Sequence, residues 1–156
     1  GDIDYVLERY SSYHNPVFRG GSDDIQGGSG NDTIFGDFRQ IDISNYAYVY
    51  AGSDTIEGGE GNDQLYGDIG TSVSVPGGWG YTGAADVFVF NPNSGADNIH
   101  DFQDGIDKLD VSGYGFTSAA DMTLGVNNGQ TFVQFTATDY VYFHTTITMT
   151  DDDFIF

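Results

Sequence analysis

The chain has 156 residues, with 24 acidic side chains against four basic ones and a formal net charge of −20 at pH 7. This charge excludes nucleic acids and anionic membranes as partners, because both are bound through a basic face. An aromatic content of 15% supplies core material and so excludes a disordered acidic chain. No apolar segment approaches the roughly 20 residues of a membrane-spanning helix.

Aspartate supplies 21 of the 24 acidic residues and glutamate only three. An acidic surface that only meets solvent would use both. The preference for the shorter carboxylate, together with 23 glycines, indicates turns and sites for hard cations such as Ca²⁺. The chain has no cysteine, so something other than disulfide bonds must stabilise the fold.

Residues 1–17 match no pattern that we can name, and we expect them to be a lead-in segment or linker. The abrupt opening GDIDYVLERY and the lack of a visible cleavable signal predict a piece of a longer protein.

From residue 18 a nine-residue unit repeats, with aspartate in its sixth position and an apolar residue in its eighth. The six units contain Asp23 with Ile25, Asp32 with Ile34, Asp54 with Ile56, Asp63 with Leu65, Asp86 with Phe88, and Asp97 with Ile99. The units come in pairs that recur every 31 or 32 residues, with inserts at residues 36–48 and 67–80 between them. Because the two inserts interrupt the repeat at equivalent places, we expect them on the same side of the repeating structure.

In each unit, Gly, Asn and Asp predict a turn and the next three residues a short strand, so that two units close one coil. Stacked coils build a core from the eighth-position residues that is too thin to hold the fold by burial alone. Ca²⁺ bound between stacked turns would supply the remaining stability, with backbone carbonyls and sixth-position carboxylates as its ligands. A metal-free solenoid is the alternative, but Asn or Ser would form its turns equally well.

The units resemble the RTX nonapeptide G-G-x-G-x-D-x-U-x, whose repeats bind Ca²⁺. GGSGNDTIF and GGEGNDQLY match every defined position. The resemblance implies an all-β protein with a right-handed parallel β-roll at residues 18–100 that binds several Ca²⁺ ions. Asp32, Asp63 and Asp97 are expected along one edge, and Asp23, Asp54 and Asp86 along the other. The implied metal-site residues are Gly21, Asp23, Gly27, Gly28, Gly30, Asp32, Gly52, Asp54, Gly58, Gly59, Gly61, Asp63, Asp86, Gly95, Asp97 and Asp101.

The inserts depart from the uninterrupted repeats of the family and are rich in aromatic residues. Tyr46, Tyr48 and Tyr50 alternate along one expected strand, and Trp79 and Tyr81 lie in or next to the second insert. Such a row can stack against sugar rings or pack against the roll, and packing is the favoured interpretation.

Residues 101–156 are expected to form a capping β-sheet or sandwich. ADVFVF, DFQDGIDKLDVSGYGF and the terminal DDDFIF resemble, in that order, the C-terminal region of serralysin-type proteases and related type I secreted bacterial proteins. This resemblance implies an uncleaved C-terminal export signal for a type I secretion transporter. DDDFIF also fits an edge strand of the last sheet. Asp139 is expected to matter far less for the Ca²⁺ response than Asp32 and Asp63.

No HExxH, G-x-S-x-G or P-loop motif is present, and His14, His100 and His144 lack metal-ligand spacing. We therefore expect a non-catalytic, extracellular calcium-binding module at the C-terminus of a larger secreted bacterial protein, promoting type I secretion and Ca²⁺-dependent folding. The alternatives are a polysaccharide-binding module resembling the R-modules of alginate epimerases, or the terminal segment of an RTX adhesin. Four basic residues are few for an anionic polysaccharide.

Overall fold

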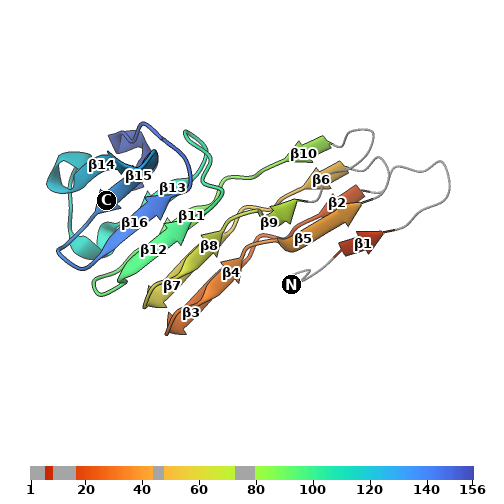
Figure 1. The fold of residues 1–156 in the computed structure, drawn as a ribbon, viewed down its shortest axis with the longest axis horizontal. Helices are drawn as coiled ribbons and strands as arrows, with labels where there is room; N and C mark the ends of the chain where they lie inside the picture. Colours follow the sequence, from red (N-terminus) through yellow and green to blue (C-terminus); the bar gives the residue numbers. More distant parts are fainter. Residues whose placement is uncertain (1–5, 9–16, 44–47, 73–79) are drawn as a thin grey trace.

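The computed structural model of the chain describes residues 6–8, 17–43, 48–72 and 80–156. These residues form seventeen β-strands and three short 3₁₀ helices. No helix among them is long and apolar enough to cross a bilayer. Figure 1 shows an elongated molecule in which the strands are stacked side by side in two lobes. The expected all-β roll of parallel strands is confirmed.

Each of the first two coils contains four strands rather than two. The first coil consists of β3 (Asp24–Ser29), β4 (Thr33–Phe35), β5 (Phe38–Ile43) and β6 (Tyr48–Tyr50). The second consists of β7 (Thr55–Glu60), β8 (Gln64–Tyr66), β9 (Ile69–Ser72) and β10 (Gly80–Thr82). The inserts therefore contain strands that stack in register, with Phe38 beside Ile69 and Tyr48 beside Gly80.

The third coil is shorter. It consists of β11 (Val87–Val89), β12 (Ala96–Ile99) and β13 (Lys108–Asp110). Between β12 and β13 a compact turn takes the place of an insert, closed by hydrogen bonds from the backbone N–H groups of Ile106 and Asp107 to the carbonyl of Gln103.

The strands form four sheets. Two belong to the lobe made by the inserts, with strand orders β1-β5-β9 and β10-β6-β2, and they include β1 (Val6–Glu8) and β2 (Val17–Arg19). The other two form the main roll, with orders β17-β13-β11-β7-β3 and β14-β15-β16-β12-β8-β4. All pairs are parallel except those that join β14, β15 and β16.

Two separate hydrophobic cores follow from this path. Successive side chains of a strand alternate between faces, so the eighth-position residues share the inward face of their sheets. They stack in two rows, one of Ile25, Ile56 and Phe88 and the other of Ile34, Leu65 and Ile99. Five of these six residues are buried in the main core, and Ile25 is partly buried against it. A second, smaller core inside the insert lobe consists of Phe38, Ile41 and Val49, with Phe18 and Ile69 packed against it.

A C-terminal cap covers the open end of the main roll, as a solenoid requires. It contains η1 (Ser112–Tyr114), η2 (Ala119–Asp121), β14 (Thr123–Asn127), β15 (Gln130–Gln134), β16 (Tyr140–Phe143), η3 (Asp151–Asp153) and β17 (Phe154–Ile155). Strand β16 pairs in parallel with β12, and β17 pairs in parallel with β13. The cap thus continues both sheets of the roll, and the terminal residues form an edge strand.

We predict that Leu65→Ala lowers the free energy of unfolding by about 2–5 kcal/mol, the usual effect of removing a buried leucine side chain. Leu65 is 0% exposed and stands between Ile34 and Ile99 in its row. Urea denaturation in saturating Ca²⁺ measures the change. In the control Val126→Ala, at a side chain that is 58% exposed, the change should stay within about 0.5 kcal/mol. Equal losses in the two variants would contradict the prediction.

Candidate calcium sites

The tight turns that connect β3 to β4 and β7 to β8 place aspartates of successive coils above one another. The backbone N–H of Asp32 donates to Oδ1 of Asp63 at 2.9 Å. The N–H of Asp63 donates in the same way to Oδ1 of Asp97, also at 2.9 Å. The three aspartates expected along one edge therefore form a continuous ladder in which one carboxylate oxygen is used for stacking.

The second carboxylate oxygens in this ladder lie against turn glycines. Oδ2 of Asp32 and Oδ2 of Asp63 are buried and have no hydrogen-bond partner among the described residues. A Cβ atom on Gly27 would lie 2.4 Å from the carbonyl oxygen of Gly58 and 3.0 Å from Asp32 Oδ2. A Cβ atom on Gly58 would lie 2.2 Å from Asp63 Oδ2. Carboxylate and carbonyl oxygens thus crowd spaces that only glycine leaves open, and such oxygens are the ligands Ca²⁺ prefers.

The backbone of these turns depends on glycine for its conformation. Gly28 and Gly59, neighbours in register, have φ values of 99° and 101°, in the left-handed region that other residues avoid. In the third coil Asn93 takes the equivalent place with a φ of 76°. The turn there still follows the repeat, because Asn tolerates this region better than most residues.

A second ladder lies at the junction between the two lobes, which we call the waist. The N–H groups of Asp23, Asp54 and Asp86 donate to Oδ1 of Asp54, Asp86 and Asp107 at 2.7, 2.8 and 3.0 Å. We expected Asp23, Asp54 and Asp86 along the other edge from Asp32, Asp63 and Asp97, and they form this separate ladder. Asp54 and Asp86 are only 2% and 1% exposed, because the insert strands extend the coils beyond them.

Three buried aspartates of the site region were missed by the sequence reasoning. Asp37 and Asp68 each follow a glycine at the start of an insert, and Asp107 precedes β13; all three are at most 3% exposed. The repeated IFGDF and LYGDI, 31 residues apart, could have identified the first two. Asp37 Oδ2 accepts a hydrogen bond from Gly52 N–H at 2.7 Å, which joins the two ends of the first insert.

The predicted glycines fall into two groups. Those at the tight turns are Gly27, Gly28, Gly30, Gly58, Gly59, Gly61 and Gly95. Gly21 and Gly52 meet at the waist, where a Cβ atom on Gly52 would lie 1.4 Å from the carbonyl oxygen of Gly21. Asp101 stands apart from both groups, because it accepts hydrogen bonds from the N–H groups of Gly67, Asp68 and Ile69 and so closes a turn.

The buried carboxylates have raised pKa values. Burial raises the pKa of Asp97 to about 7 and that of Asp86 to about 9, although a backbone N–H donated to each opposes the shift. Neighbouring acids, such as Asp63 beside Asp97, raise the pKa further. Within the described parts of the chain, no three acidic or imidazole side chains are grouped so that they could hold a metal ion by themselves, so a bound ion would also need backbone oxygens.

Asp139, which we expected to matter far less for the Ca²⁺ response than Asp32 and Asp63, lies where the third coil meets the cap. It is 3% exposed and accepts hydrogen bonds from the N–H of Asn93 at 3.1 Å and from the Tyr114 hydroxyl at 3.2 Å. It therefore holds the turn that carries Asn93 against the cap.

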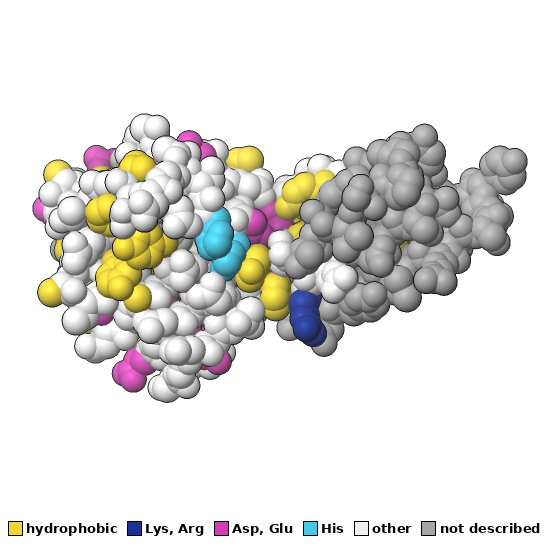
Figure 2. Space-filling model, in the orientation of Figure 1, with side chains coloured by type: hydrophobic (Ala, Val, Ile, Leu, Met, Phe, Trp, Pro, Cys, Tyr) yellow, Lys and Arg dark blue, Asp and Glu magenta, His cyan; other side chains and the backbone are white. Residues whose placement is uncertain are grey.

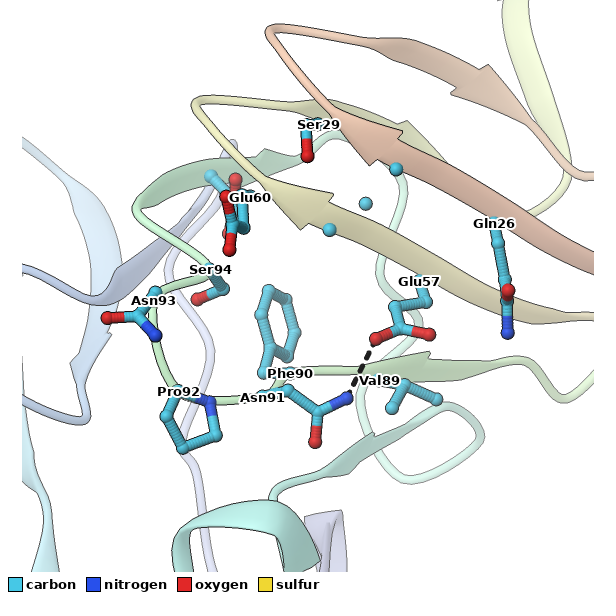
Figure 3. Close-up of a pocket in the computed structure, with 14 residues that line it drawn as sticks. Gln26, Ser29, Glu57, Glu60, Val89, Phe90, Asn91, Pro92, Asn93 and Ser94 are labelled. Atoms are coloured by element: carbon cyan, nitrogen blue, oxygen red, sulfur yellow. Dashed lines mark hydrogen bonds between the residues drawn. The ribbon is translucent and has the colours of Figure 1, made fainter.

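A polar pocket of about 360 Å³ opens beside the tight-turn ladder (Figure 3). The turn of the third coil is two residues longer than its counterparts, because Asp86 and Asp97 are 11 residues apart where the equivalent aspartates of the first two coils are nine apart. Glu57 and Glu60 project toward this longer turn, and the Asn91 side-chain amide donates to Glu57 Oε1 at 2.7 Å. The lining combines these groups with Gln26 and Ser29.

The aromatic residues of the inserts do not form one row. Tyr48 is 45% exposed, whereas Tyr50 is half-buried with the Arg19 guanidinium 4.5 Å from its ring centre. Tyr81 is the register partner of Val49, whose side chain faces the opposite side of β6 from Tyr48 and Tyr50. The Tyr81 hydroxyl donates a hydrogen bond to Asp68 Oδ2 at 2.6 Å. Tyr46 and Trp79 lie outside the described residues.

A different aromatic stack, which the sequence reasoning missed, crosses the sheet of β4, β8, β12 and β16. It contains Phe35, Tyr66, His100 and His144, with successive ring centres 4.7, 4.2 and 3.9 Å apart. Figure 2 shows the two histidines side by side on the surface in cyan. The stack is formed because equivalent positions of parallel coils lie directly above one another.

Residues 19–38 and 43–73 match the model of the RTX calcium-binding nonapeptide repeat, in four copies. No curated protein matches the chain. Among solved structures, the chain is similar to the AlgE6R2 subunit of a mannuronan C5-epimerase from Azotobacter vinelandii, with 25% identity, 89% of this chain and 91% of that chain covered, and a TM-score of 0.47. The chain is also similar to the AlgE6R3 subunit of that epimerase, with 22% identity, 98% of this chain and 86% of that chain covered, and a TM-score of 0.43.

The repeat match ends at residue 73, yet the aspartate ladders continue in the structure through Asp86, Asp97 and Asp107. Residues 19–38 and 43–73 therefore carry RTX calcium-binding nonapeptide repeats, and in the structure these repeats form a parallel roll with glycine turns.

Proposed function

We propose that the chain is a non-catalytic calcium-binding module of a larger exported bacterial protein, and that it folds when it meets Ca²⁺ outside the cell. The observation that carries this proposal is the tight-turn ladder, where buried carboxylate oxygens without hydrogen-bond partners among the described residues face glycine carbonyls. Burying such charges without a counter-ion is strongly unfavourable.

The ion positions follow from the stacking. One Ca²⁺ between the first and second coils would be held by Asp32 and Asp63, and another between the second and third coils by Asp63 and Asp97. Carbonyl oxygens of the glycine turns would complete the six to eight oxygen ligands that Ca²⁺ takes. When bound, the ion supplies the positive charge that the ladder lacks.

Linkage then couples the ions to folding. Each ion that binds only the folded chain stabilises it by RT ln(1 + [Ca²⁺]/Kd), so that several sites make folding steeply dependent on Ca²⁺. In the cytosol Ca²⁺ is scarce, and a net charge of −20 keeps the chain expanded by self-repulsion. Extracellular Ca²⁺ is roughly millimolar, within the affinity range of extracellular modules.

An export role for the C-terminus is compatible with this fold. DDDFIF contributes β17, which pairs with β13 through Leu109 and Asp110, and Ile155 and Phe156 remain partly exposed. Because secretion would take place before folding, the same residues can serve as a signal in the unfolded chain and as an edge strand afterwards. We propose a type I transporter as the partner of the unfolded segment.

Binding of a neutral oligosaccharide is a second candidate function, favoured by the pocket beside Asn91. Its amide, hydroxyl and carboxylate groups can accept and donate hydrogen bonds to sugar hydroxyls. Its two glutamates and the overall charge disfavour an anionic polymer.

Removal and return of Ca²⁺ tests the main proposal. We expect chelated protein to show little β-sheet signal in far-UV circular dichroism and to gain it on Ca²⁺ addition, with little response to Mg²⁺, whose octahedral geometry suits these carbonyl-rich turns poorly. A chelated sample that is equally folded would contradict the proposal.

The double variant D32N/D63N should raise the Ca²⁺ concentration at the folding midpoint by about tenfold or more, because both unpartnered oxygens of the ladder are lost. D24N is the matched control, since it removes a carboxylate that is exposed on β3. If D24N shifts the midpoint as much as the double variant, net charge rather than the ladder governs folding.

Stability without Ca²⁺ should fall as pH rises. Burial raises the pKa of Asp97 from 3.8 to about 7 and that of Asp86 to about 9, so the fold favours their neutral forms. Their contribution to stability is complete below about pH 4 and is lost through about pH 7 to 9. Metal-depleted protein should therefore show more β-sheet signal in far-UV circular dichroism at about pH 5 than at about pH 8, whereas in saturating Ca²⁺ the urea midpoint should be higher at about pH 8. If the urea midpoint in saturating Ca²⁺ is higher at about pH 5 than at about pH 8, these carboxylates do not bind the ions.

Calorimetric titration of neutral and acidic oligosaccharides in Ca²⁺ tests the second candidate. We expect heat with a neutral sugar that Asn91→Ala abolishes, because this amide lies at the mouth of the pocket. Asn127→Ala, in the cap, should leave the heat unchanged. If no sugar produces heat with the wild-type chain, this candidate is removed.

A further inference from the structure

The waist places carboxylates where a protein interior is normally apolar. Asp37, Asp54, Asp68, Asp86 and Asp107 are each at most 3% exposed. In the first coil the chain leaves the main core through Asp37 and returns to it through Asp54. Asp68 and Asp86 do the same in the second coil. Five carboxylates therefore lie at the junction of two apolar clusters, where uncompensated charge is strongly unfavourable.

Basic side chains are too few to balance this charge. Of the four in the chain, Arg19 lies over the ring of Tyr50, and the Lys108 ammonium donates to the carbonyl oxygen of Asp152. At most two remain for five carboxylates. Most of the compensation must come from hydrogen-bond donors, protons or bound cations.

The two insert-base aspartates, Asp37 and Asp68, differ in how they are compensated. Asp68 Oδ1 accepts from Ala84 N–H at 3.1 Å, and its Oδ2 accepts from the Tyr81 hydroxyl and the Gln103 side-chain amide. Asp37 Oδ2 accepts from Gly52 N–H, but its Oδ1 is buried and has no hydrogen-bond partner among the described residues. Asp37 therefore presents an oxygen that the surrounding protein has not used.

Other oxygens converge at this level of the waist. A Cβ atom on Gly20 would lie 1.6 Å from Asp37 Oδ1. A Cβ atom on Gly36 would lie 2.0 Å from the carbonyl oxygen of Gly67 and 2.2 Å from Asp54 Oδ2. Glycines thus leave room for carboxylate and carbonyl oxygens, as they do at the tight turns.

We propose that the waist holds a divalent cation between stacked coils, bound by Asp37 and Asp54 together with glycine carbonyl oxygens, and that this cation is Ca²⁺ in the extracellular medium. The inference rests on the proposed function, in which Asp54 is a sixth-position aspartate, and adds Asp37 as a ligand that the nonapeptide does not contain. Since Asp37 also binds Gly52 N–H, the cation ties the insert lobe to the main roll.

A neutral, protonated Asp37 is the competing explanation, and the substitution Asp37→Asn distinguishes the two. An asparagine side chain has nearly the shape and the hydrogen-bonding capacity of a neutral carboxyl group, but it carries no charge for a cation. Asp37→Asn therefore preserves a protonated arrangement and disrupts a cation site.

Native mass spectrometry of the full chain in Ca²⁺ counts the bound ions in the wild type and in the variants D37N, D24N and D63N. We expect D37N to bind one ion fewer than the wild type and to need about tenfold more Ca²⁺ for half-maximal folding. The exposed-site control D24N should match the wild type. D63N reports separately on the tight-turn ladder.

The outcomes separate this inference from the proposed function. A full ion count in D37N, with a reduced count in D63N, overturns the waist site and leaves the calcium-dependent module intact. A wild-type chain that binds no Ca²⁺ overturns the proposed function itself.

If D37N does not fold even in excess Ca²⁺, crystals of the wild-type chain grown with Tb³⁺ in place of Ca²⁺ decide the question. An anomalous difference peak in contact with Asp37 supports the site. Tb³⁺ peaks at the tight turns with none at Asp37 overturn it.

Discussion

The fold depends on stacking carboxylates in register inside a parallel roll. In the tight-turn ladder Asp63 and Asp97 each use one oxygen to accept the backbone N–H of the preceding coil, which fixes the register, and the second oxygens of Asp32 and Asp63 lie against turn glycines. The hydrogen bond favours stacking, whereas burial of the charge opposes it. A divalent cation between the coils resolves this conflict, because it compensates two carboxylates at once. The stability of the roll is in this way linked to the solution around it.

The inserts are part of the folded roll rather than loops attached to it. An insert in a solenoid is usually a loop that the repeating core does not need. Here each insert carries two strands that stack on those of the next coil and enclose a core of their own around Phe38, Ile41 and Val49. The coil is therefore a wider ring with two apolar cores and an acidic layer between them. That layer binds the lobes together only if its charge is compensated.

The third coil marks the transition from repeat to cap. It replaces the insert with a compact turn and lengthens the opposite turn at Asn91, and the antiparallel strands β14 to β16 then extend the roll's own sheet. Both changes end the periodicity, and the cap covers the end of the roll so that its last regular coil is not left open. The longer turn also contributes Asn91, Pro92 and Asn93 to the lining of the polar pocket.

The roll, the tight-turn ladder and the inward row from Ile34 to Ile99 could be predicted from the amino-acid sequence, because each depends only on residues within a nine-residue unit and on their exact recurrence. The edge strand at the C-terminus could be predicted as well. Three features emerged only from the folded chain: Asp54 and Asp86 lie inside the molecule, Asp37 and Asp68 join them, and Tyr81 points toward Asp68 rather than extending the tyrosine row. These features depend on how inserts of irregular sequence stack across coils about 31 residues apart, and a local pattern carries no information about what a distant segment will cover.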